Sequence, residues 1–494
     1  MKELKVLPAL ILVLVARLAL AQGYGGELTF QGMEHYQLHS AASRAMGGVT
    51  VAAQDVASMF NNPAMLAGIA GVGVSVAGAA FAHRQEQEQN YAPVRYYANL
   101  SLLLEGLTSG IPDPNPELPG FTPADTVQRP YDNIGPNWSR SSNGQYPLHL
   151  LAAVPFRVSE VQFTAGLGAV QYADLDHFYQ HNNVLSPSIL SQRPLPTMRP
   201  SDDNPLVVDW YQTVRSRRGS IWGYGFALAA QVQKLHSSFG VSGLLLRGES
   251  DDEEQYVGRG RLTFFANAFR ADSVGWRLRK SGTSRFNGQE LAVSWLLSGT
   301  HASLGLTVRP PAEIKREMSA DVESVGLNEV NNASLVTGPP AGGKDRLKLP
   351  WRGTAGLAIT PKEWLTLGFE YELRPYKSAR FVDSIGKESS PWLSSSPFRV
   401  GVELRASPWL ALRAGMRNEA EVFEPEGNQL PGEPVTYSVY SCGASVTFRG
   451  VRMDLAVENA LMKYQDIWSS AISKNSERRW IALGQLAYEI PWRP

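Results

Sequence analysis

The 494-residue chain has a single cysteine, Cys442, so no internal disulfide can form and stability must come from burial and backbone pairing. Acidic and basic residues balance at 46 each, which points to neither nucleic acid nor any other strongly charged partner. Beyond the first 20 residues there is no long apolar run, which argues against a helical membrane protein. What the chain does contain is a series of short alternations of apolar and polar residues.

The first residues have the pattern of a secretory signal peptide. Lys2 and Lys5 precede the apolar stretch 6–20, and residues 19–21 (Ala-Leu-Ala) have the small-x-small form that signal peptidase cuts. The stretch is shorter than the roughly 20 residues that a spanning helix needs. We therefore predict that residues 1–21 are removed and that the mature chain begins at Gln22.

Six pairs of alternating runs are each joined by only a few turn residues, and long polar stretches rich in Gly, Pro and Asn separate one pair from the next. The short joints are Arg157 to Glu160, His236 to Ser238, Ser298 to His301, Thr360 to Glu363, Ser407 with Pro408, and Arg449 with Gly450. A membrane β-barrel inserted from one side has short turns there and long loops on the far side. A soluble sandwich has no reason to keep that asymmetry.

The runs around these joints predict twelve strands, and two more complete the wall. The twelve are 148–156, 161–172, 221–235, 239–247, 291–297, 302–309, 351–359, 364–373, 398–406, 409–417, 437–448 and 451–459. Val72 to Val76 supplies a first strand, and Trp480 to Ile490 supplies a last one. We assign two further apolar runs, Tyr96 to Leu107 and Leu262 to Phe269, to extracellular loops; counting both as strands would give sixteen instead of fourteen.

Alternation along each run predicts one face toward lipid and one toward the lumen, because neighbouring strand residues point to opposite sides. Leu365, Phe369 and Tyr371 share one face, for example, whereas Glu370 and Glu372 share the other. An unpaired backbone group costs several kcal/mol in hydrocarbon, so the last strand must pair with the first. The tryptophans at strand ends suit aromatic girdles at the two interfaces; these are Trp351, Trp364, Trp409, Trp480 and Trp492.

Residues 22–70 precede the first strand and are rich in Gly, Ala and Ser, with few charges. A periplasmic tail would normally be more polar, so we predict a compact plug inside the barrel. The predicted organisation is a signal peptide at 1–21, a plug or hatch at 22–70 and a transmembrane barrel at 71–494. A disordered N-terminal extension is the alternative.

This segment resembles the N-terminal hatch of the FadL/TodX long-chain fatty acid transporters. The resemblance rests on residues 42–48 (ASRAMGG) and 53–66 (AQDVASMFNNPAML), in which Asn62, Pro63 and Ala64 form the Asn-Pro-Ala motif that ends the family's hatch. The stretches 352–371 and 398–417 are similar to the family's C-terminal strands. PorV-like barrels of type IX secretion have a similar Asn-Pro-Ala-Gly segment, but Met65 stands in place of that glycine here.

The resemblance implies a monomeric, hatch-plugged, 14-stranded barrel in the Gram-negative outer membrane, in contact with its lipid and lipopolysaccharide. It implies passive uptake of hydrophobic molecules such as long-chain fatty acids or hydrocarbons, with sideways exit near a kinked strand. Gly166 and Gly168 in the third strand could permit such a kink, and close packing is an equal alternative. A secretion-associated barrel that binds exported proteins is the competing function.

The predicted lumen face carries arginines that either pair with lumen carboxylates or hold a substrate carboxylate. These candidate ligand contacts are Arg374, Arg399, Arg405, Arg413 and Arg417. Such a balanced lumen would not select strongly for one ion sign, which disfavours a simple ion-diffusing pore. No serine and histidine arrangement supports catalysis, and the scattered histidines form no convincing metal set, so we expect neither an enzyme nor a metal or cofactor.

Overall fold

The fold was analysed in a computed structural model of the chain. It describes residues 25–34, 37–89, 113–114, 133–186, 201–265, 268–272, 274–327, 333–338, 340–424, 434–468 and 471–491. The predicted signal peptide, the run Tyr96 to Leu107 and Trp492 lie outside these residues. Within them, no helix is long and apolar enough to cross a membrane.

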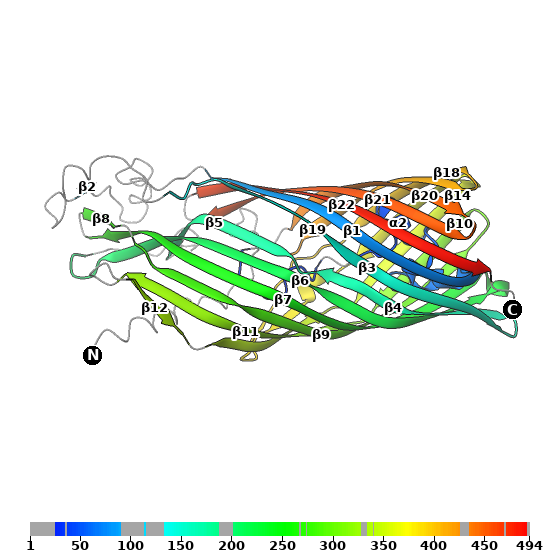
Figure 1. The fold of residues 1–494 in the computed structure, drawn as a ribbon, viewed down its shortest axis with the longest axis horizontal. Helices are drawn as coiled ribbons and strands as arrows, with labels where there is room; N and C mark the ends of the chain where they lie inside the picture. The colour runs from blue at the N-terminus through cyan, green and yellow to red at the C-terminus, as the bar shows by residue number, and fades with distance from the viewer. Residues whose placement is uncertain are drawn as a thin grey trace.

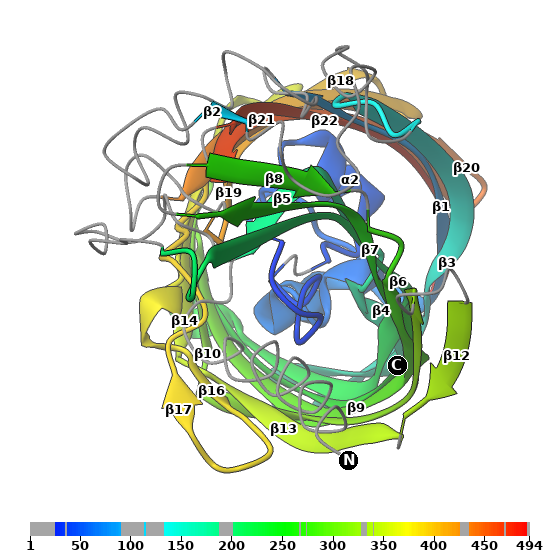
Figure 2. The same ribbon diagram turned by 90° about the vertical axis from the view of Figure 1, so that its left-hand side faces the viewer.

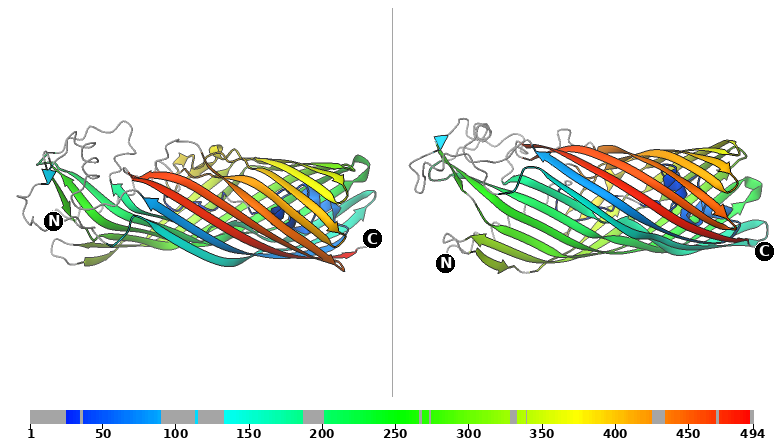
Figure 3. Two further views of the ribbon diagram at one scale, coloured as in Figure 1. Left: turned by 90° about the horizontal axis from the view of Figure 1, so that it is seen from above. Right: turned by 45° about the horizontal axis from the view of Figure 1, so that its top comes forward.

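Fourteen antiparallel strands form a closed wall in the part of the chain that the structure describes (Figure 1). In ring order they are β1 (Gly71–Gln89), β3 (Trp138–Val158), β4 (Val161–Asp174), β6 (Leu206–Val232), β7 (Ser237–Phe264), β9 (Arg277–Ser298), β10 (Ala302–Arg309), β14 (Arg352–Lys362), β15 (Leu365–Leu373), β18 (Phe398–Ser407), β19 (Leu410–Glu421), β20 (Val435–Phe448), β21 (Val451–Trp468) and β22 (Ala471–Pro491). β22 then pairs with β1 from Gly71↔Pro491 to Gln89↔Ser473, and both views of Figure 3 show these two strands side by side. The prediction of a closed 14-stranded barrel is confirmed.

The six predicted short joints all occur, at one end of the barrel. Ser159, His236 and Arg449 adopt positive φ angles of 57°, 49° and 49° in three of them, as tight turns between antiparallel strands require. Several strands run well beyond their predicted limits at the opposite end, where β6, β7 and β9 pair far past the apolar part of the wall. Alternation of apolar residues ends where the wall leaves the bilayer, so it could not reveal these extensions.

The extensions carry further elements at the long-loop end. The additional strands are β2 (Asp113–Pro114), β5 (His177–Ser186), β8 (Ala268–Asp272), β11 (Ala312–Leu327), β12 (Ala333–Thr337), β13 (Ala341–Leu349), β16 (Arg380–Val382) and β17 (Glu388–Ser389), with the 3-10 turns η6 (Gln233–Leu235) and η7 (Tyr376–Ser378). Pro310 and Pro311 separate β11 from β10, and Pro350 separates β13 from β14, because proline removes a ladder donor. The run Leu262 to Phe269, expected in a loop, belongs partly to the end of β7 and partly to its hairpin partner β8.

The two faces of the wall alternate as predicted. Phe369 and Tyr371 are exposed on the outer face, whereas Glu370 and Glu372 between and beside them are 2% exposed. Of the tryptophans predicted at strand ends, Trp351, Trp364 and Trp409 lie there on the outer face, 45–57% exposed, whereas Trp480, 49% exposed, lies in the middle of β22. The outer face is therefore apolar and edged by aromatic rings, as a bilayer-spanning wall requires.

Residues 25–34 and 37–70, which we call the N-terminal segment, lie inside the ring (Figure 2). The segment contains the short helix α2 (Ala41–Ala45) and the 3-10 turns η3 (Val56–Ser58) and η4 (Pro63–Gly68). Ser40 caps α2 through its side chain, and Pro63 starts η4 at a position where its missing N–H costs nothing. The turns of this segment contact the inner faces of β3, β4, β6, β7 and β9, and α2 contacts those of β19 to β22.

Candidate functional site

The two edges of β3 are paired to very different extents. On its β1 side, β3 is paired from Trp138 to Ala153 with one register shift. On its β4 side, the ladder runs from Val158↔Val161 only as far as His149↔Val170. Among the described residues, β3 therefore has no strand partner on that side between residues 138 and 148.

The cause is an inward departure of the neighbouring strand. β4 shifts register against β6 between Gln171 and Ala173, and β5 continues along β6 after it. Side chains of β5 reach across the lumen: Tyr179 Oη lies 3.4 Å from Asp466 Oδ2 on β21, and His181 Nε2 lies 3.1 Å from Ser473 Oγ on β22. Figure 2 shows β5 within the outline of the ring.

We call the resulting gap the wall window. It lies between residues 140–147 of β3 and residues 171–178 of β4 and β5. The His149↔Val170 pair closes it below. Above it, the Phe178 ring stacks under the Arg140 guanidinium at 4.1 Å and meets the Trp138 ring at 5.6 Å.

A cavity of about 530 Å³ connects the lumen with the wall window. On the lumen side its lining includes Arg374, Arg399 and Arg417, and at the window it includes the outward-facing residues Asn143 and Arg218. The volume falls within the range of small-molecule sites. Backbone groups of the open β3 edge face this cavity, and such groups are tolerated at membrane depth only where they line a wet or occupied space.

The N-terminal segment contacts two carbonyls of β4 that lie beyond the point where the pairing of β4 with β3 ends. The Gln37 N–H donates to the Tyr172 carbonyl at 3.3 Å, and His39 Nε2 lies 3.1 Å from the Gln171 carbonyl oxygen. Gly32, at a φ of 94°, lies so close to β4 that an added Cβ would stand 2.7 Å from the Asp174 carbonyl oxygen. A side chain at this position would push the inward bend away, so glycine is needed there.

His39 also joins this bend to the residue before the hatch motif. Its backbone N–H donates to Asn61 Oδ1 at 3.1 Å, and its Nδ1 lies 3.1 Å from the same oxygen. Burial lowers the pKa of His39 to about 3, against the opposite effect of its hydrogen bonds. The ring is therefore neutral at pH 7 and donates through one nitrogen only. Its two nitrogens each face an oxygen, the Gln171 carbonyl and Asn61 Oδ1, so the neutral ring can donate to one of the two.

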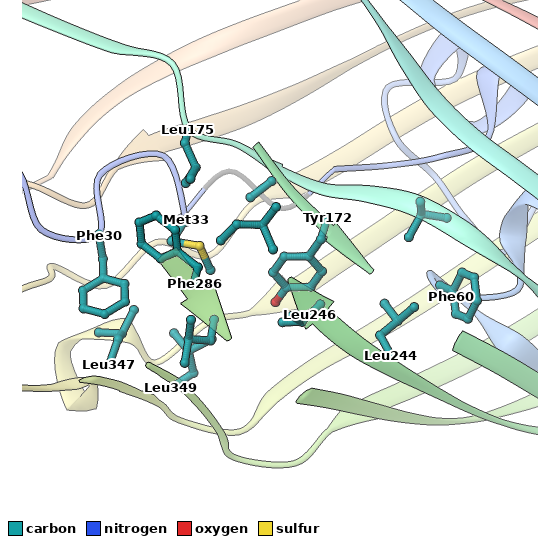
Figure 4. Close-up of a cluster of buried hydrophobic side chains, with 14 of the residues drawn as sticks. Phe30, Met33, Phe60, Tyr172, Leu175, Leu244, Leu246, Phe286, Leu347 and Leu349 are labelled. Carbon is teal, nitrogen blue, oxygen red and sulfur yellow. The ribbon is translucent and has the colours of Figure 1, made fainter. Parts of the chain in front are cut away.

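An apolar cluster fixes the start of the N-terminal segment beside the inward bend (Figure 4). Phe30 meets the rings of Phe286 and Phe381 edge-on, each at a centroid distance of 6.0 Å. Met33 lies in the same cluster, together with Leu175 at the bend. Burying side chains of this size typically contributes about 1.5–3 kcal/mol each, so the bend and the segment stabilise one another.

The motif Asn62, Pro63, Ala64 lies against the wall opposite the β19–β22 side. The Ala64 N–H donates to Ser294 Oγ on β9 at 2.6 Å, and Asn62 is buried. Gly240 on β7 allows this contact, since a Cβ there would lie 2.3 Å from the Ala64 nitrogen. The sequence placed this motif in the plug without indicating which wall strands it touches.

The five candidate arginines are all engaged with carboxylates, and they fall into two groups. Arg374, Arg399 and Arg417 line the cavity. Arg374 contacts Glu372, and Arg399 contacts both Glu370 and Glu372. Arg417 contacts Glu419 and Glu458. Arg405 and Arg413 lie near the short-turn end and share Glu403. On the N-terminal segment, Arg44 contacts Glu458, so the segment joins the same network.

The two candidate kink glycines lie in the regularly paired part of β4, opposite Ala153 and Leu151. A Cβ at Gly166 would lie 2.9 Å from Met59 Cε of the N-terminal segment, and one at Gly168 would lie 2.4 Å from the Leu150 carbonyl oxygen. Both positions are thus closely packed, and the interruption comes later, at residues 171–176. No glycine or proline occurs within 171–176, so the composition of this part of β4 offered no sign of the break.

Comparison with known proteins points to one type of structure. No family model matches the chain, and no curated protein matches it by sequence. A FadL homologue from Pseudomonas aeruginosa is similar in structure, with a TM-score of 0.56 and 13% identity over 93% of this chain and 99% of that one.

Two further solved structures are similar over nearly their full length. The P. putida toluene transporter TodX has a TM-score of 0.52 and 15% identity over 92% of this chain and 100% of that one. The monoaromatic hydrocarbon channel CymD has a TM-score of 0.52 and 12% identity over 93% and 100%. The chain therefore has the fold of the FadL and TodX transporters.

Proposed function

We propose that this protein is an outer-membrane channel through which hydrophobic small molecules enter passively. The observation that carries the proposal is the cavity, which runs from the charged lumen to the wall window. An apolar molecule that left the lumen through this window would pass into the bilayer without crossing the aqueous space beneath the barrel. The apolar outer face and the predicted signal peptide support the outer membrane as its location.

In this proposal the N-terminal segment acts as a hatch that closes the lumen below the cavity. Its buried backbone is tied to both sides of the wall: the Ala41 N–H donates to Gln485 Oε1, and the Thr50 N–H donates to Glu370 Oε2, each at 2.8 Å. A molecule in the cavity then has the window as its route to lipid. The single-chain closure of the wall supports action as a monomer.

The cavity lining favours an amphiphile with a charged end over a plain hydrocarbon. Phe81, Met462, Phe423 and Ile481 provide apolar surface, whereas the Arg374, Arg399 and Arg417 network provides polar surface beside it. A long-chain fatty acid can use both surfaces, with its carboxylate competing for an arginine already held by glutamate. A hydrocarbon of equal length can use only one of them.

The experiment is uptake of radiolabelled palmitate and hexadecane by cells that lack this gene, with and without the gene restored. We expect restored cells to take up palmitate at least about fivefold faster, with a smaller gain for hexadecane. Equal uptake of both compounds with and without the gene would contradict the proposal. The FadL, TodX and CymD structures are of transporters and channels, so they give no support to the secretion-associated alternative.

A further inference from the structure

A group of cations lies on the outer face of the wall where β11, β13 and β16 meet. Lys315 stands directly opposite Arg346, and Lys348 stands directly opposite Arg380. Since directly opposed residues share a face of the sheet, all four side chains point outward together. We call these four residues the outer cationic patch.

Opposed like charges destabilise a sheet unless an anion lies between them. Arg346 has no carboxylate at ion-pair distance among the described residues, and Arg380 donates to the Ser390 hydroxyl at 3.3 Å. Lys315 is 70% exposed and lies 3.7 Å from Glu313. The patch therefore contains more positive charge than its neighbours neutralise.

Glu388 lies on β17, which pairs with β16, and it serves several of these cations at once. Lys348 Nζ lies 3.0 Å from Glu388 Oε1. The pKa of Glu388 is lowered, first by this hydrogen bond and charge and then also by Arg380 and Arg346. Glu313 stands opposite Lys348 on β11, so the four cations of the patch face two carboxylates, Glu313 and Glu388.

The row of residues next along the same strands lacks this imbalance. Across β7, β9, β11 and β13 it alternates in sign, as Glu249, Arg285, Glu317 and Lys344. Arg285 lies 3.3 Å from Glu249, and Lys344 lies 3.1 Å from Glu317. Cations in that row are internally paired, so they provide a matched control on the same face.

The patch begins directly above the apolar part of the outer wall. Val308 on β10 and Trp351 before β14 are exposed outer-face residues, and the next outward residues along these chains are those of β11 and β13. Aromatic residues of this kind mark the level of the lipid headgroups. A set of cations immediately beyond them lies where headgroup phosphates are found.

We propose that the outer cationic patch binds the phosphate groups of a glycolipid in the outer leaflet. Arg346 and Arg380 supply planar guanidinium donors, which suit bidentate contact with phosphate, and Lys315 and Lys348 add point charges beside them. This inference requires only that the barrel spans the outer membrane, so it stands or falls independently of the cargo.

The test is native mass spectrometry of the full-length mature barrel in detergent, titrated with bisphosphoryl lipid A. The test variant is Arg346→Gln with Arg380→Gln, and the control variant is Arg285→Gln with Lys344→Gln. Both variants remove two positive charges from the same face, so a difference between them reports on position. Resistance of the unboiled barrel to SDS verifies that each variant is folded.

We expect the test variant to bind bisphosphoryl lipid A at least about tenfold more weakly than the parent, because each basic residue near a membrane surface contributes roughly fivefold. The control variant should stay within about twofold. For the parent protein, lipid A stripped of phosphate should bind at least about tenfold more weakly, and millimolar inorganic phosphate should not displace the lipid. Equal binding by the test variant, equal binding of the stripped lipid, or full displacement by free phosphate would each overturn the proposal.

Discussion

The two edges of β3 differ in how far along the strand they are paired with a neighbour. The β1 edge is hydrogen-bonded up to Trp138, whereas the β4 edge is open above His149. The open edge lines the cavity, and on the β4 side the Tyr172 and Gln171 carbonyls contact Gln37 and His39 of the N-terminal segment. Closed edges hold the barrel together, and the open edge lines the route that we propose.

A strand that borders an opening in a β-barrel wall can therefore stay fully paired on its other edge. β3 keeps one register with β1 from Pro147 to Trp138, above a shift at Leu148, and the larger departure is made by its neighbour, which contacts the N-terminal segment, β21 and β22 from the inside. The cost of unpaired backbone in a membrane is met by hydrogen bonds from within the lumen. Stability and passage can therefore be altered separately.

The largest expected effect is on stability, through the buried ion pairs of the lumen. Arg399→Gln removes the cation that contacts both Glu370 and Glu372; Glu372 keeps Arg374, but the buried Glu370 loses its ion-pair partner. We expect a loss of about 3–5 kcal/mol in the free energy of unfolding, measured by urea titration of the barrel in vesicles. Arg405→Gln, whose side chain is 64% exposed, should cost less than about 1 kcal/mol. Equal losses in the two variants would contradict the role assigned to the buried network.

The next effect is on passage through the open edge. Ser142 lines the cavity, whereas Ser141 beside it points to the outside. Ser142→Trp should lower the rate of palmitate uptake by at least about tenfold because the ring fills part of the route, and Ser141→Trp should change it less than about twofold. If tryptophan at either position had the same effect, the wall window would not be the route.

A smaller effect should follow when the link between the N-terminal segment and the bend is cut. His39→Leu removes the ring that faces both the Gln171 carbonyl and Asn61 Oδ1, and losing a buried hydrogen bond costs about 1–3 kcal/mol. Hydrogen exchange should become faster at residues 171–176 and stay unchanged at residues 480–490 of β22. His301→Leu, in an exposed turn, should leave both regions unchanged. Unaltered exchange at 171–176 in the His39 variant would show that the bend does not depend on this residue.

The smallest effect concerns pH. Because burial lowers the pKa of His39 from its ordinary value of 6.5 to about 3, the native state favours the neutral ring. Its contribution to stability is complete above pH 6.5 and is lost progressively as the pH falls toward 3. Urea midpoints at pH 7 and pH 4.5 should therefore differ more for the parent protein than for His39→Gln. An identical pH dependence in both proteins would contradict the depressed pKa.

Much of the fold could be predicted from the sequence, because a membrane imposes a strict rule on each wall strand. Tyr371 and Glu372 alternate between lipid and lumen as expected, and Arg449 with Gly450 forms the tight turn that its composition indicated. The number of strands followed from these turns. The lumen position of the charges on Arg399 and Glu370 also followed, since alternate residues must face inward.

The wall window could not be predicted in this way. Its position is set by contacts between residues distant in sequence, such as Gly32 with Asp174 and Tyr179 with Asp466. Glycines 166 and 168 offered a local signal, but the strand is interrupted several residues later, where no glycine or proline occurs. The outer cationic patch was equally hidden, because the opposition of Lys315 and Arg346 depends on the register between β11 and β13.

The most direct test of the wall window as the ligand's route is anomalous diffraction from crystals of the protein soaked with a fatty acid that carries a terminal bromine. We expect a bromine peak within the cavity, between residues 142–146 of β3 and residues 174–178 of β4 and β5. A wall in which β3 and its neighbour are hydrogen-bonded up to Trp138, with the bromine outside the barrel, would contradict it.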